Sequence, residues 1–467
     1  MIQNNFKSNF VYNTCYQVLA ILIPFVTTPY ISRILGPEKI GEYSYAYSVA
    51  NYFVLFAMLG LNNYGNRTIA SVYDDRSKLS KRFCEIYVVQ IVTTFVSLCG
   101  YFLYLLMFGT SILAVIMILY VLSAGFDINW LFYGLEEFKL ITVRNVGIKI
   151  TSTILIFVLI KSEADIWKYA LLMVGSILLS QVVVWPAALQ RISYVKVSVK
   201  NVRAHFKSIM ILFVPTIAVS IYKVMDKVML GAMNSTLQVG FYESAEKVMA
   251  IPLCIINSLG TVMLPRMANM LKTGTSKSYQ ITVETSAIFA AFITAPMIAG
   301  IMSITREFVP IFYGHGYEQC ISLLCILLPS CLFVALANVI RTQILIPQKE
   351  DKTYIVSCMA GAVVNLVLNT ITIPTLGALG AAIATLIAEI IVCTYQAIKV
   401  WHDINMKFIL SQYIVAVAMS TIMGVIVVHL SSLPFSQLTI LIFKIIVGIM
   451  IYGSMILIYY KRIKTRN

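Results

Sequence analysis

The sequence predicts an all-α polytopic membrane protein with about fourteen transmembrane helices, and three observations support this fold class. Only 12% of the 467 residues are charged and 59% are hydrophobic, whereas a soluble chain carries roughly 25% charged residues. The apolar residues occur in blocks of about 20, the length a helix needs to cross a bilayer core. Lys and Arg concentrate in alternate connections between these blocks, which is the charge pattern of membrane proteins.

The apolar blocks define the predicted helices in chain order. We expect the first to be a retained helix, since no small-residue cleavage site follows a short apolar core. The predicted spans cover residues 10–34, 42–62, 83–107, 111–134, 145–161, 168–190, 208–231, 238–263, 282–303, 320–345, 354–373, 376–398, 409–430 and 437–460.

The distribution of Lys and Arg predicts the orientation of these spans. With the amino terminus in the cytoplasm, 26 of the 35 lie in cytoplasmic segments, five lie in outer segments and four lie within spans. Removing one central helix would scramble this bias, so it supports both the number of spans and cytoplasmic termini. Membrane orientation therefore explains the net charge of +15 better than nucleic-acid binding does. The connections are short, which predicts that the working parts lie within the helix bundle.

An internal repeat predicts the domain organisation. The pattern Leu-Gly, a short turn, then [Ile/Val]-Gly-x-Tyr-x-x-Ala occurs at 35–46 and again at 230–245. Six predicted helices separate the copies, and an even number means that both halves cross the membrane in the same direction. The predicted parts are an N-terminal lobe (1–200), a C-terminal lobe (201–404) and two added helices with a cytoplasmic tail (405–467).

Ionisable residues inside the predicted spans are the candidate functional groups, because each costs about 2.5–3.5 kcal/mol at membrane depth. The spacing of Lys223 and Lys227 places them on one face of the seventh span, with Asp226 nearby. The candidate cations for binding an anionic substrate are Arg33, Lys223, Lys227 and Lys247. The candidate carboxylates for coupling or ion pairing are Asp226, Glu243, Glu246 and Asp127.

Two interpretations of these charges stay open. Either the acids and bases pair to hold helices together, or they face a wet cavity. A positive cavity would suit a phosphate or pyrophosphate group, although Glu243 would cancel the excess of cations. Glu389 and Lys444 are further charges within spans, and each is either paired, extended toward the membrane surface or functional.

The sequence contains no constellation typical of an enzyme. The four histidines are far apart, the nine cysteines form no Cys-x-x-Cys pair, and the Walker A, Gly-x-Ser-x-Gly and His-Glu-x-x-His motifs are missing. We therefore expect no catalysis, no metal and no cofactor. Energy for transport would come from an ion gradient, the membrane potential or substrate flux.

Four segments, in order, carry a resemblance to a known family. They are the run Thr-Thr-Pro-Tyr-Ile-Ser-Arg-Ile-Leu-Gly-Pro with its following Gly-Glu-Tyr-Ser (27–44), the run beginning Asp-Ile-Asn-Trp (127–145), and the segments 226–247 and 365–382. Together they resemble polysaccharide-type Wzx flippases of the multidrug/oligosaccharidyl-lipid/polysaccharide (MOP) exporter superfamily, which is MATE-like. The resemblance covers nearly the whole chain.

The resemblance implies a function as well as a fold. It implies two six-helix lobes in a V shape and alternating access. The implied activity is export of an undecaprenyl-pyrophosphate-linked oligosaccharide across the bacterial plasma (inner) membrane, from the cytoplasmic to the outer leaflet. Implied partners are the lipid bilayer, a polysaccharide polymerase and chain-length proteins. The cations Arg33, Lys223, Lys227 and Lys247 then become candidates for contacting the pyrophosphate.

Alternatives remain at this point. A MATE-like cation-coupled drug antiporter would share the fold, but would favour a carboxylate-dominated site and usually twelve helices. A membrane polymerase would be expected to have a large outer loop, and a scaffold would leave the charges within spans unexplained. The sequence leaves open the sugar repeat, whether in capsule, O-antigen, teichoic-type polymer or exopolysaccharide, and it leaves open the coupling ion.

Overall fold

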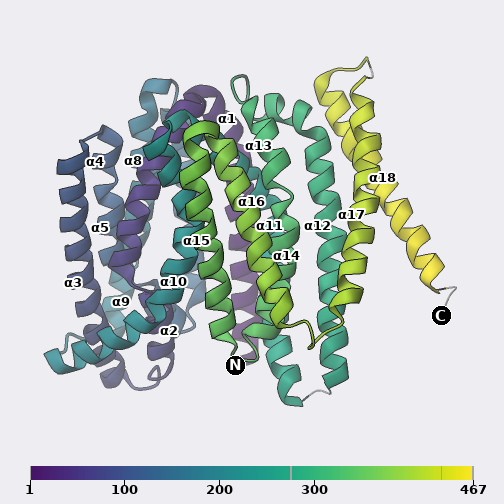
Figure 1. Cartoon of the computed structure of the whole chain (residues 1–467). Coiled ribbons are helices and arrows are strands. Elements are labelled where there is room, and N and C mark those ends of the chain that lie inside the picture. The colour runs from purple at the N-terminus through teal and green to yellow at the C-terminus, as the bar shows by residue number, and fades with distance from the viewer. Residues whose placement is uncertain (1, 274–275, 433, 465–467) are drawn as a thin grey trace. The chain divides into compact units, whose positions relative to one another are not determined.

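The protein is helical throughout the part of the chain that its computed structural model describes (Figure 1). The structure describes residues 2–273, 276–432 and 434–464, with the side chains of 23–210, 213, 217, 220, 224–272, 277–431, 434–459 and 461. The helices divide into two compact units, unit 1 (Met1–Ser220) and unit 2 (Ile221–Asn467). Each unit is considered by itself, and the predicted division at residues 200 and 404 stays a prediction.

The two units consist of helices joined by short connections. Unit 1 contains α1 (Ile2–Met58), α2 (Leu61–Ala70), α3 (Arg76–Phe108), α4 (Ile112–Ile116), α5 (Ile118–Phe126), α6 (Asn129–Gly134), α7 (Phe138–Leu159), η1 (Glu163–Asp165), α8 (Ile166–Val183), α9 (Trp185–Arg191) and the first part of α10 (Val199–Met233). Unit 2 contains the rest of α10, α11 (Thr236–Thr273), α12 (Ser276–Phe312), α13 (Gln319–Leu327), α14 (Ser330–Ile340), η2 (Arg341–Leu345), α15 (Asp351–Leu376), α16 (Ala378–Lys399), α17 (Met406–His429), η3 (Leu430–Ser432) and α18 (Gln437–Lys464).

The predicted fold class is confirmed. Among the described residues, twelve segments are long and apolar enough to cross a membrane. One of them, Ile23–Ala70, contains the end of the first predicted span and all of the second, and α1 is broken between the two at Gly36. Gly36 has φ 71° and ψ 170°, a conformation that only glycine adopts without strain. The predicted span 208–231 lies in α10, some of whose side chains are outside the described set. The helices follow one another in the order of the fourteen predicted spans.

The fourth and tenth predicted spans are each built from shorter helices. α5 ends at Phe126 and α6 begins at Asn129, and between them the carboxylate of Asp127 accepts a hydrogen bond from the backbone N–H of Asn129 (3.1 Å). Pro329 separates α13 from α14, and the chain then widens into the π-helical turn η2. These breaks release backbone groups inside an apolar segment, where polar side chains satisfy them. A pattern of apolar residues does not reveal such breaks.

The core of unit 1 is organised around Trp130, which is fully buried. The indole N–H of Trp130 donates to Gln90 (3.0 Å), and the Gln90 amide in turn donates to the carbonyl oxygens of Ala124 (2.6 Å) and Asp127 (2.9 Å). Gly65 lies so close to the Trp130 ring that a β-carbon there would come within 2.7 Å of it. The buried Gln90 side chain therefore provides hydrogen-bond partners for the indole of Trp130 and for two backbone carbonyl groups at the break between α5 and α6.

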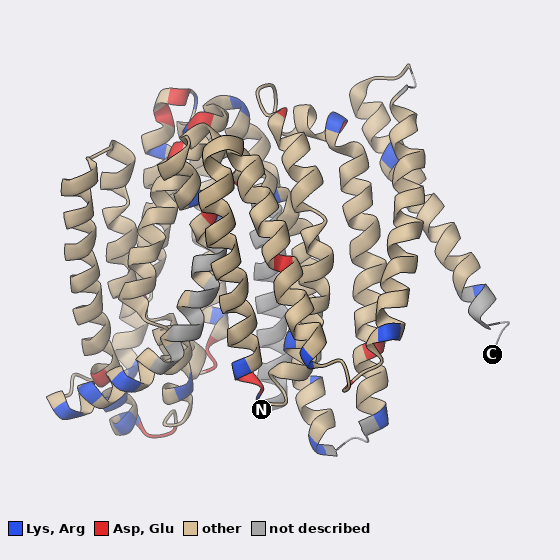
Figure 2. Ribbon diagram, viewed as in Figure 1, with Lys and Arg blue, Asp and Glu red and all other residues tan. Residues whose placement is uncertain are grey.

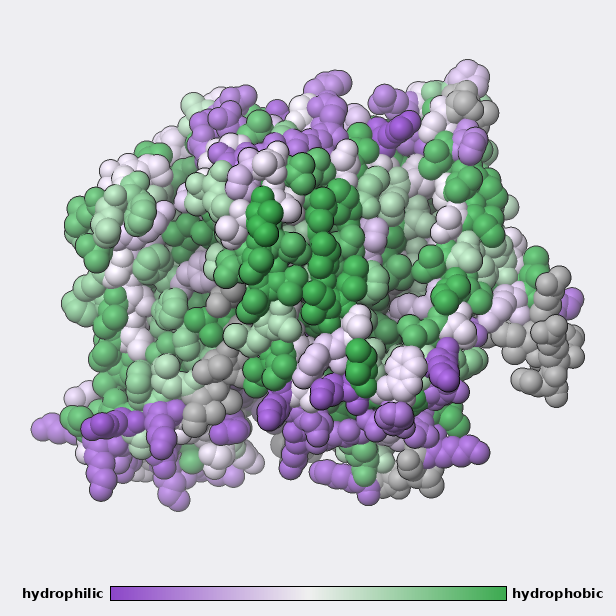
Figure 3. Space-filling model, in the orientation of Figure 1, coloured by the Kyte–Doolittle hydropathy of each residue, from purple (hydrophilic) through white to green (hydrophobic). Residues whose placement is uncertain are grey.

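The outer surfaces of the helices are apolar. Exposed hydrophobic side chains line α3, α15 and α18, for example Phe102, Val367 and Ile449. Figure 3 shows hydrophobic residues along the sides of the helices and hydrophilic residues toward their ends. In Figure 2, Lys and Arg gather near helix ends within each unit taken by itself. A surface of this kind fits lipid around the helices and water at their ends, as expected of a multi-pass membrane protein.

Candidate functional site

A buried carboxylate, Asp226, joins four helices of unit 2. Its side chain on α10 is 3% exposed. Oδ2 accepts hydrogen bonds from the hydroxyl groups of Tyr242 on α11 (2.6 Å) and Thr385 on α16 (2.6 Å), and Oδ1 accepts one from the amide of Asn369 on α15 (2.6 Å). A carboxylate can only accept hydrogen bonds while it is ionised, so these three neutral donors support a negative charge inside the helix bundle.

Two asparagines extend the Asp226 cluster along α15. The amide of Asn369 also donates to Oδ1 of Asn365 (3.0 Å). Oδ1 of Asn369 and Nδ2 of Asn365 are buried without a hydrogen-bond partner among the described residues. Carboxylate, amide and hydroxyl oxygens are the ligand types that hard cations bind, and the cluster supplies all three. The described residues contain no group of three His, Cys, Asp or Glu side chains suited to a metal ion.

The next residue along α10, Lys227, forms a separate charged group with α11. Its ammonium lies 3.0 Å from Oε2 of Glu243 and 2.9 Å from Oε2 of Glu246. Glu243 also lies 3.6 Å from the ammonium of Lys247. The side chains are only partly exposed, 16% for Lys227, 20% for Glu243 and 39% for Glu246. Two lysines and two glutamates therefore form one charge-balanced group that water can still reach.

The predicted site residues fall into three sets. The structure brings four of the eight together in unit 2, places Asp226 in the separate cluster of the same unit, and places two in unit 1. The set in unit 2 is Asp226, Lys227, Glu243, Glu246 and Lys247, and the set in unit 1 is Arg33 and Asp127. The side chain of Lys223 lies outside the described residues. The five described residues of unit 2 comprise three carboxylates and two lysines, so the net positive charge we expected depends on Lys223 or Arg33 and stays a prediction.

Arg33 and Asp127 have different surroundings within unit 1. Arg33 is an exposed residue of α1. Asp127 is partly buried, lies between α5 and α6, and accepts the N–H of Asn129, the first residue of α6. The side-chain amide group of Asn129 accepts from Arg144 (3.0 Å) and donates to Gln181 (3.1 Å), which ties α6 to α7 and α8. The described contacts give Asp127 a structural role, and its coupling role stays a prediction.

Lys444 and Glu389, the other charges noted within spans, differ in their contacts. Lys444 is 1% exposed and donates to Glu307 Oε1 (2.7 Å), the Ser303 carbonyl oxygen (3.1 Å) and the Ser431 hydroxyl (2.6 Å). This cluster fastens α18 to α12. Glu389 lies one turn beyond Thr385 on α16, and no described residue forms an ion pair or hydrogen bond with its side chain. The sequence indicated Lys444 but not its partner Glu307.

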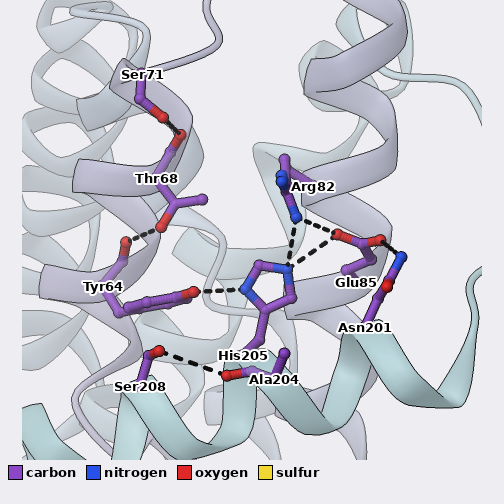
Figure 4. A network of polar contacts seen from close by, with 9 residues as sticks. All are labelled: Tyr64, Thr68, Ser71, Arg82, Glu85, Asn201, Ala204, His205 and Ser208. Carbon is purple, nitrogen blue, oxygen red and sulfur yellow. Dashed lines mark hydrogen bonds and ion pairs between the residues drawn. The ribbon is translucent and has the colours of Figure 1, made fainter.

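A second buried polar cluster, in unit 1, was missed from the sequence. His205 on α10 lies between Tyr64 on α2 and Glu85 on α3 (Figure 4). Its Nδ1 is 2.5 Å from the Tyr64 hydroxyl and its Nε2 is 2.9 Å from Glu85 Oε2. Glu85 is fully buried and also accepts from Arg82 (3.0 Å) and Asn201 (2.7 Å). The cluster thus holds the start of α10 against α2 and α3.

The chemistry of the His205 cluster follows from its partners. Since a carboxylate only accepts, a hydrogen on Nε2 of His205 would point to Glu85, and Nη1 of Arg82 lies 3.3 Å from the same nitrogen. The Tyr64 hydroxyl can donate to or accept from Nδ1, so both protonation states of the ring have a partner there. The sequence signal was the pair Arg82 and Glu85, three residues apart on α3. Their meeting with His205 depends on helix packing, which spacing alone does not predict.

Comparisons with known proteins agree with this helical architecture. Residues 6–271, more than half of the chain, match the family described as polysaccharide biosynthesis proteins. The chain is 23% identical over 405 residues to the "Putative O-antigen transporter" of Escherichia coli (strain K12), a match that covers 85% of this chain and 97% of that relative.

Two solved structures have the same fold. The lipid II flippase MurJ in its inward closed conformation superposes with a TM-score of 0.74 at 16% identity, over 97% of this chain and 99% of that one. An inward-facing multidrug resistance MATE transporter of the MOP superfamily superposes with a TM-score of 0.57 at 14% identity, over 85% of this chain and 98% of that one. At these identities the likeness concerns the fold alone, and the predicted MOP-type fold is confirmed.

Proposed function

The chain belongs to the family of polysaccharide biosynthesis proteins, and from that membership we propose that it is a flippase for a lipid-linked oligosaccharide. It translocates an undecaprenyl-pyrophosphate-linked repeat unit from the cytoplasmic to the outer leaflet of the bacterial plasma membrane by alternating access. The observation that carries this proposal is the match to an O-antigen transporter over 97% of that relative's length. Twelve membrane-length helices among the described residues provide the path.

The charge-balanced group of Lys227, Lys247, Glu243 and Glu246 is where we place recognition of the pyrophosphate. Lysines without a counter-charge inside the membrane would be costly while the site is empty, and the two glutamates neutralise them. A pyrophosphate supplies several anionic oxygens at once and replaces the carboxylates as partner of the lysines. Since Glu246 and Lys247 are 39% and 35% exposed, the exchange is open to a ligand from water. Arg33 and Lys223 are further candidates for the same head group.

Coupling follows from what happens to the displaced carboxylates. Once the lysines bind phosphate, Glu243 and Glu246 lose their cations and become more costly in the charged form. Uptake of a proton or a cation neutralises them. Asp226 is a second candidate for coupling, because it holds a negative charge on neutral donors from three helices. Release of the substrate restores the lysine pairs and returns the bound proton or cation.

A MATE-like cation-coupled antiporter is the alternative function, and one observation favours it. The five described candidate site residues of unit 2 include three carboxylates, as an antiporter site for cationic compounds would. The two paired lysines favour the flippase, because they would repel a cationic drug. The flippase function involves no covalent step, so we propose that the chain is not an enzyme. A polysaccharide polymerase and chain-length proteins are proposed partners, and both termini are proposed to be cytoplasmic.

The function can be tested in a cell that carries the corresponding gene in a polysaccharide cluster. Deleting the gene is expected to remove the surface polymer and to accumulate the lipid-linked repeat unit in the inner leaflet. Complementation with the intact chain should restore the polymer, and sensitivity to cationic dyes should not change. Unaltered surface polymer together with increased dye sensitivity would support the antiporter instead.

A further inference from the structure

The first turns of α10 form a strongly basic segment in unit 1. Between Asp165 and Asp226 the chain contains no Asp or Glu, while Lys196, Lys200, Arg203 and Lys207 lie just before α10 and in its first turns. Figure 1 shows this part of α10 inclined to the long helices of unit 1, and Figure 2 shows Lys and Arg along it. Because no acidic residue of this stretch can neutralise these cations, a partner must come from elsewhere.

One face of the segment is fixed to the rest of unit 1. His205 is 5% exposed and bonds to Tyr64 and Glu85, and Asn201 donates to Glu85 (2.7 Å). Ile209, one turn further, is fully buried in the same core. In Figure 4 the partners of His205 and Asn201 approach α10 from α2 and α3. Because His205 and Ile209 face the core of unit 1, the side chains on the opposite side of α10 point away from it.

The opposite face exposes cations beside apolar side chains. Lys200, Arg203 and Lys207 are exposed, and none forms an ion pair with a described residue. Val199 and Phe206 are 83% and 42% exposed. Spacings of three, four and seven residues place Val199, Arg203 and Phe206 along one line of the helix, with the two lysines next to it. The outer side of the segment thus carries both cationic and apolar side chains, while His205 and Ile209 form its buried side.

The connection before α10 extends the same surface. The Ser193 N–H donates to the Ser80 hydroxyl (3.0 Å), which holds this connection beside the start of α3 and the exposed Lys81. Tyr194 is 87% exposed and Lys196 is also exposed. Exposed aromatic and basic residues together are typical of polypeptide at the boundary between lipid and water.

We propose that this outer face of α10 is a docking surface for anionic phospholipid headgroups. Helices that lie in the membrane interface carry Lys and Arg beside Phe or other apolar residues, with the apolar side at the acyl boundary. The chain itself places the segment at such a boundary, because α10 continues from Lys207 into the predicted span 208–231. Each cation near an anionic surface contributes about 1 kcal/mol. Lys and Arg would set the orientation of the chain in the membrane by charge alone. The exposed apolar side chains of Val199 and Phe206 beside them therefore indicate contact with lipid.

The test measures binding of a fluorescent short-chain phosphatidylglycerol to the purified full-length protein in neutral detergent, by fluorescence anisotropy. The variant Lys200→Gln/Arg203→Gln/Lys207→Gln removes three exposed cations. The control Arg266→Gln/Lys272→Gln/Lys277→Gln removes three exposed cations of unit 2 that also lack an ion pair with any described residue. We expect the first variant to weaken binding about tenfold or more, and the control to change it less than twofold. High salt should weaken binding to the intact protein.

Two outcomes would overturn the proposal: an equal loss in both variants, which indicates bulk charge, or no loss in the first. If the first variant proves unstable, Val199→Ser/Phe206→Ser replaces it, since both side chains are exposed. Hydrogen exchange of residues 199–210 supplies a second measurement, in nanodiscs of phosphatidylcholine with or without phosphatidylglycerol. Protection should rise with phosphatidylglycerol in the intact protein, and equal exchange in both lipids would contradict the docking surface.

Discussion

Two Lys–Glu clusters among the described residues of unit 2 differ in how completely the protein encloses them. Lys444 is 1% exposed, and its three acceptors are Glu307, Ser303 and Ser431. Lys227 is 16% exposed and has two carboxylates as partners, one of them 39% exposed. The first cluster satisfies one ammonium within a closed site. The second places two carboxylates beside one ammonium in a position that water reaches.

The difference separates a structural pair from a candidate binding site. An enclosed pair fixes α18 to α12 and has no route for exchange with a ligand. A partly exposed pair with a second carboxylate can change partners at little cost, because solvent and the neighbouring group compensate each step. Side-chain exposure and the number of neighbouring carboxylates therefore distinguish the candidate binding site at Lys227 from the structural pair at Lys444.

The largest effect on stability is expected from Lys444→Met. It leaves the Glu307 carboxylate buried without its cation, which should lower the free energy of unfolding by about 3–5 kcal/mol. Thermal and denaturant unfolding in detergent would measure the loss. The double variant Lys444→Met/Glu307→Met should recover most of it, because both charges are then absent. A loss below about 1 kcal/mol in the single variant would mean that the pair is not enclosed.

Lys227→Met should cost less stability but remove function. Glu243 and Glu246 lose their shared cation, and because they are partly exposed we expect a loss of about 2–3 kcal/mol. The variant Lys227→Met/Glu243→Gln/Glu246→Gln should fold normally, since the one charge it leaves in the group, on Lys247, is 35% exposed, yet it should fail to restore surface polysaccharide. Restored export at normal protein level would show that Lys227 only pairs with the glutamates and does not contact substrate.

Asp226→Asn is expected to have a smaller effect on stability. The substituted amide retains one acceptor, but its NH2 group would face a donor, so about 1–3 kcal/mol should be lost with the charged hydrogen bonds. Export should fall at least tenfold if Asp226 takes part in coupling. The exposed Asp351 at the start of α15 provides the control, Asp351→Asn. Equal export by the two variants would exclude Asp226 from coupling.

Lys247→Gln should change stability least. The Lys247 ammonium lies 3.6 Å from Glu243 and the side chain is 35% exposed, and exposed pairs contribute about 0–1 kcal/mol. Any decrease in export would then report substrate contact rather than unfolding. Protein level and unfolding temperature, measured on the same preparations, separate the two causes.

The sequence predicted the number, order and apolar character of the helices, because those depend on composition and length alone. It also identified Asp226, and it identified Lys227, Glu243, Glu246 and Lys247, which pair between two successive helices. It did not distinguish the neutral partners of Asp226 from the ionic partners of Lys227, although the two residues are adjacent.

What remained unpredicted depends on packing between distant segments. Asn369 and Thr385 reach Asp226 from two helices that follow it in the chain by more than 140 residues. His205 meets Glu85 across 120 residues. Charge and periodicity describe one helix at a time, so they carry no signal for such meetings. The break at Asp127 was likewise hidden, since the residues around it continue the apolar pattern.

The most direct test of the account is a flipping measurement with the purified chain in proteoliposomes. Fluorescent undecaprenyl-pyrophosphate-linked oligosaccharide is placed in both leaflets, and a membrane-impermeant reagent bleaches the outer pool. With the intact protein, most of the protected inner pool should become accessible. Lys227→Met/Glu243→Gln/Glu246→Gln should leave it protected, as protein-free vesicles do. Protection that persists with the intact protein, while a cationic dye moves against an ion gradient, would contradict the account.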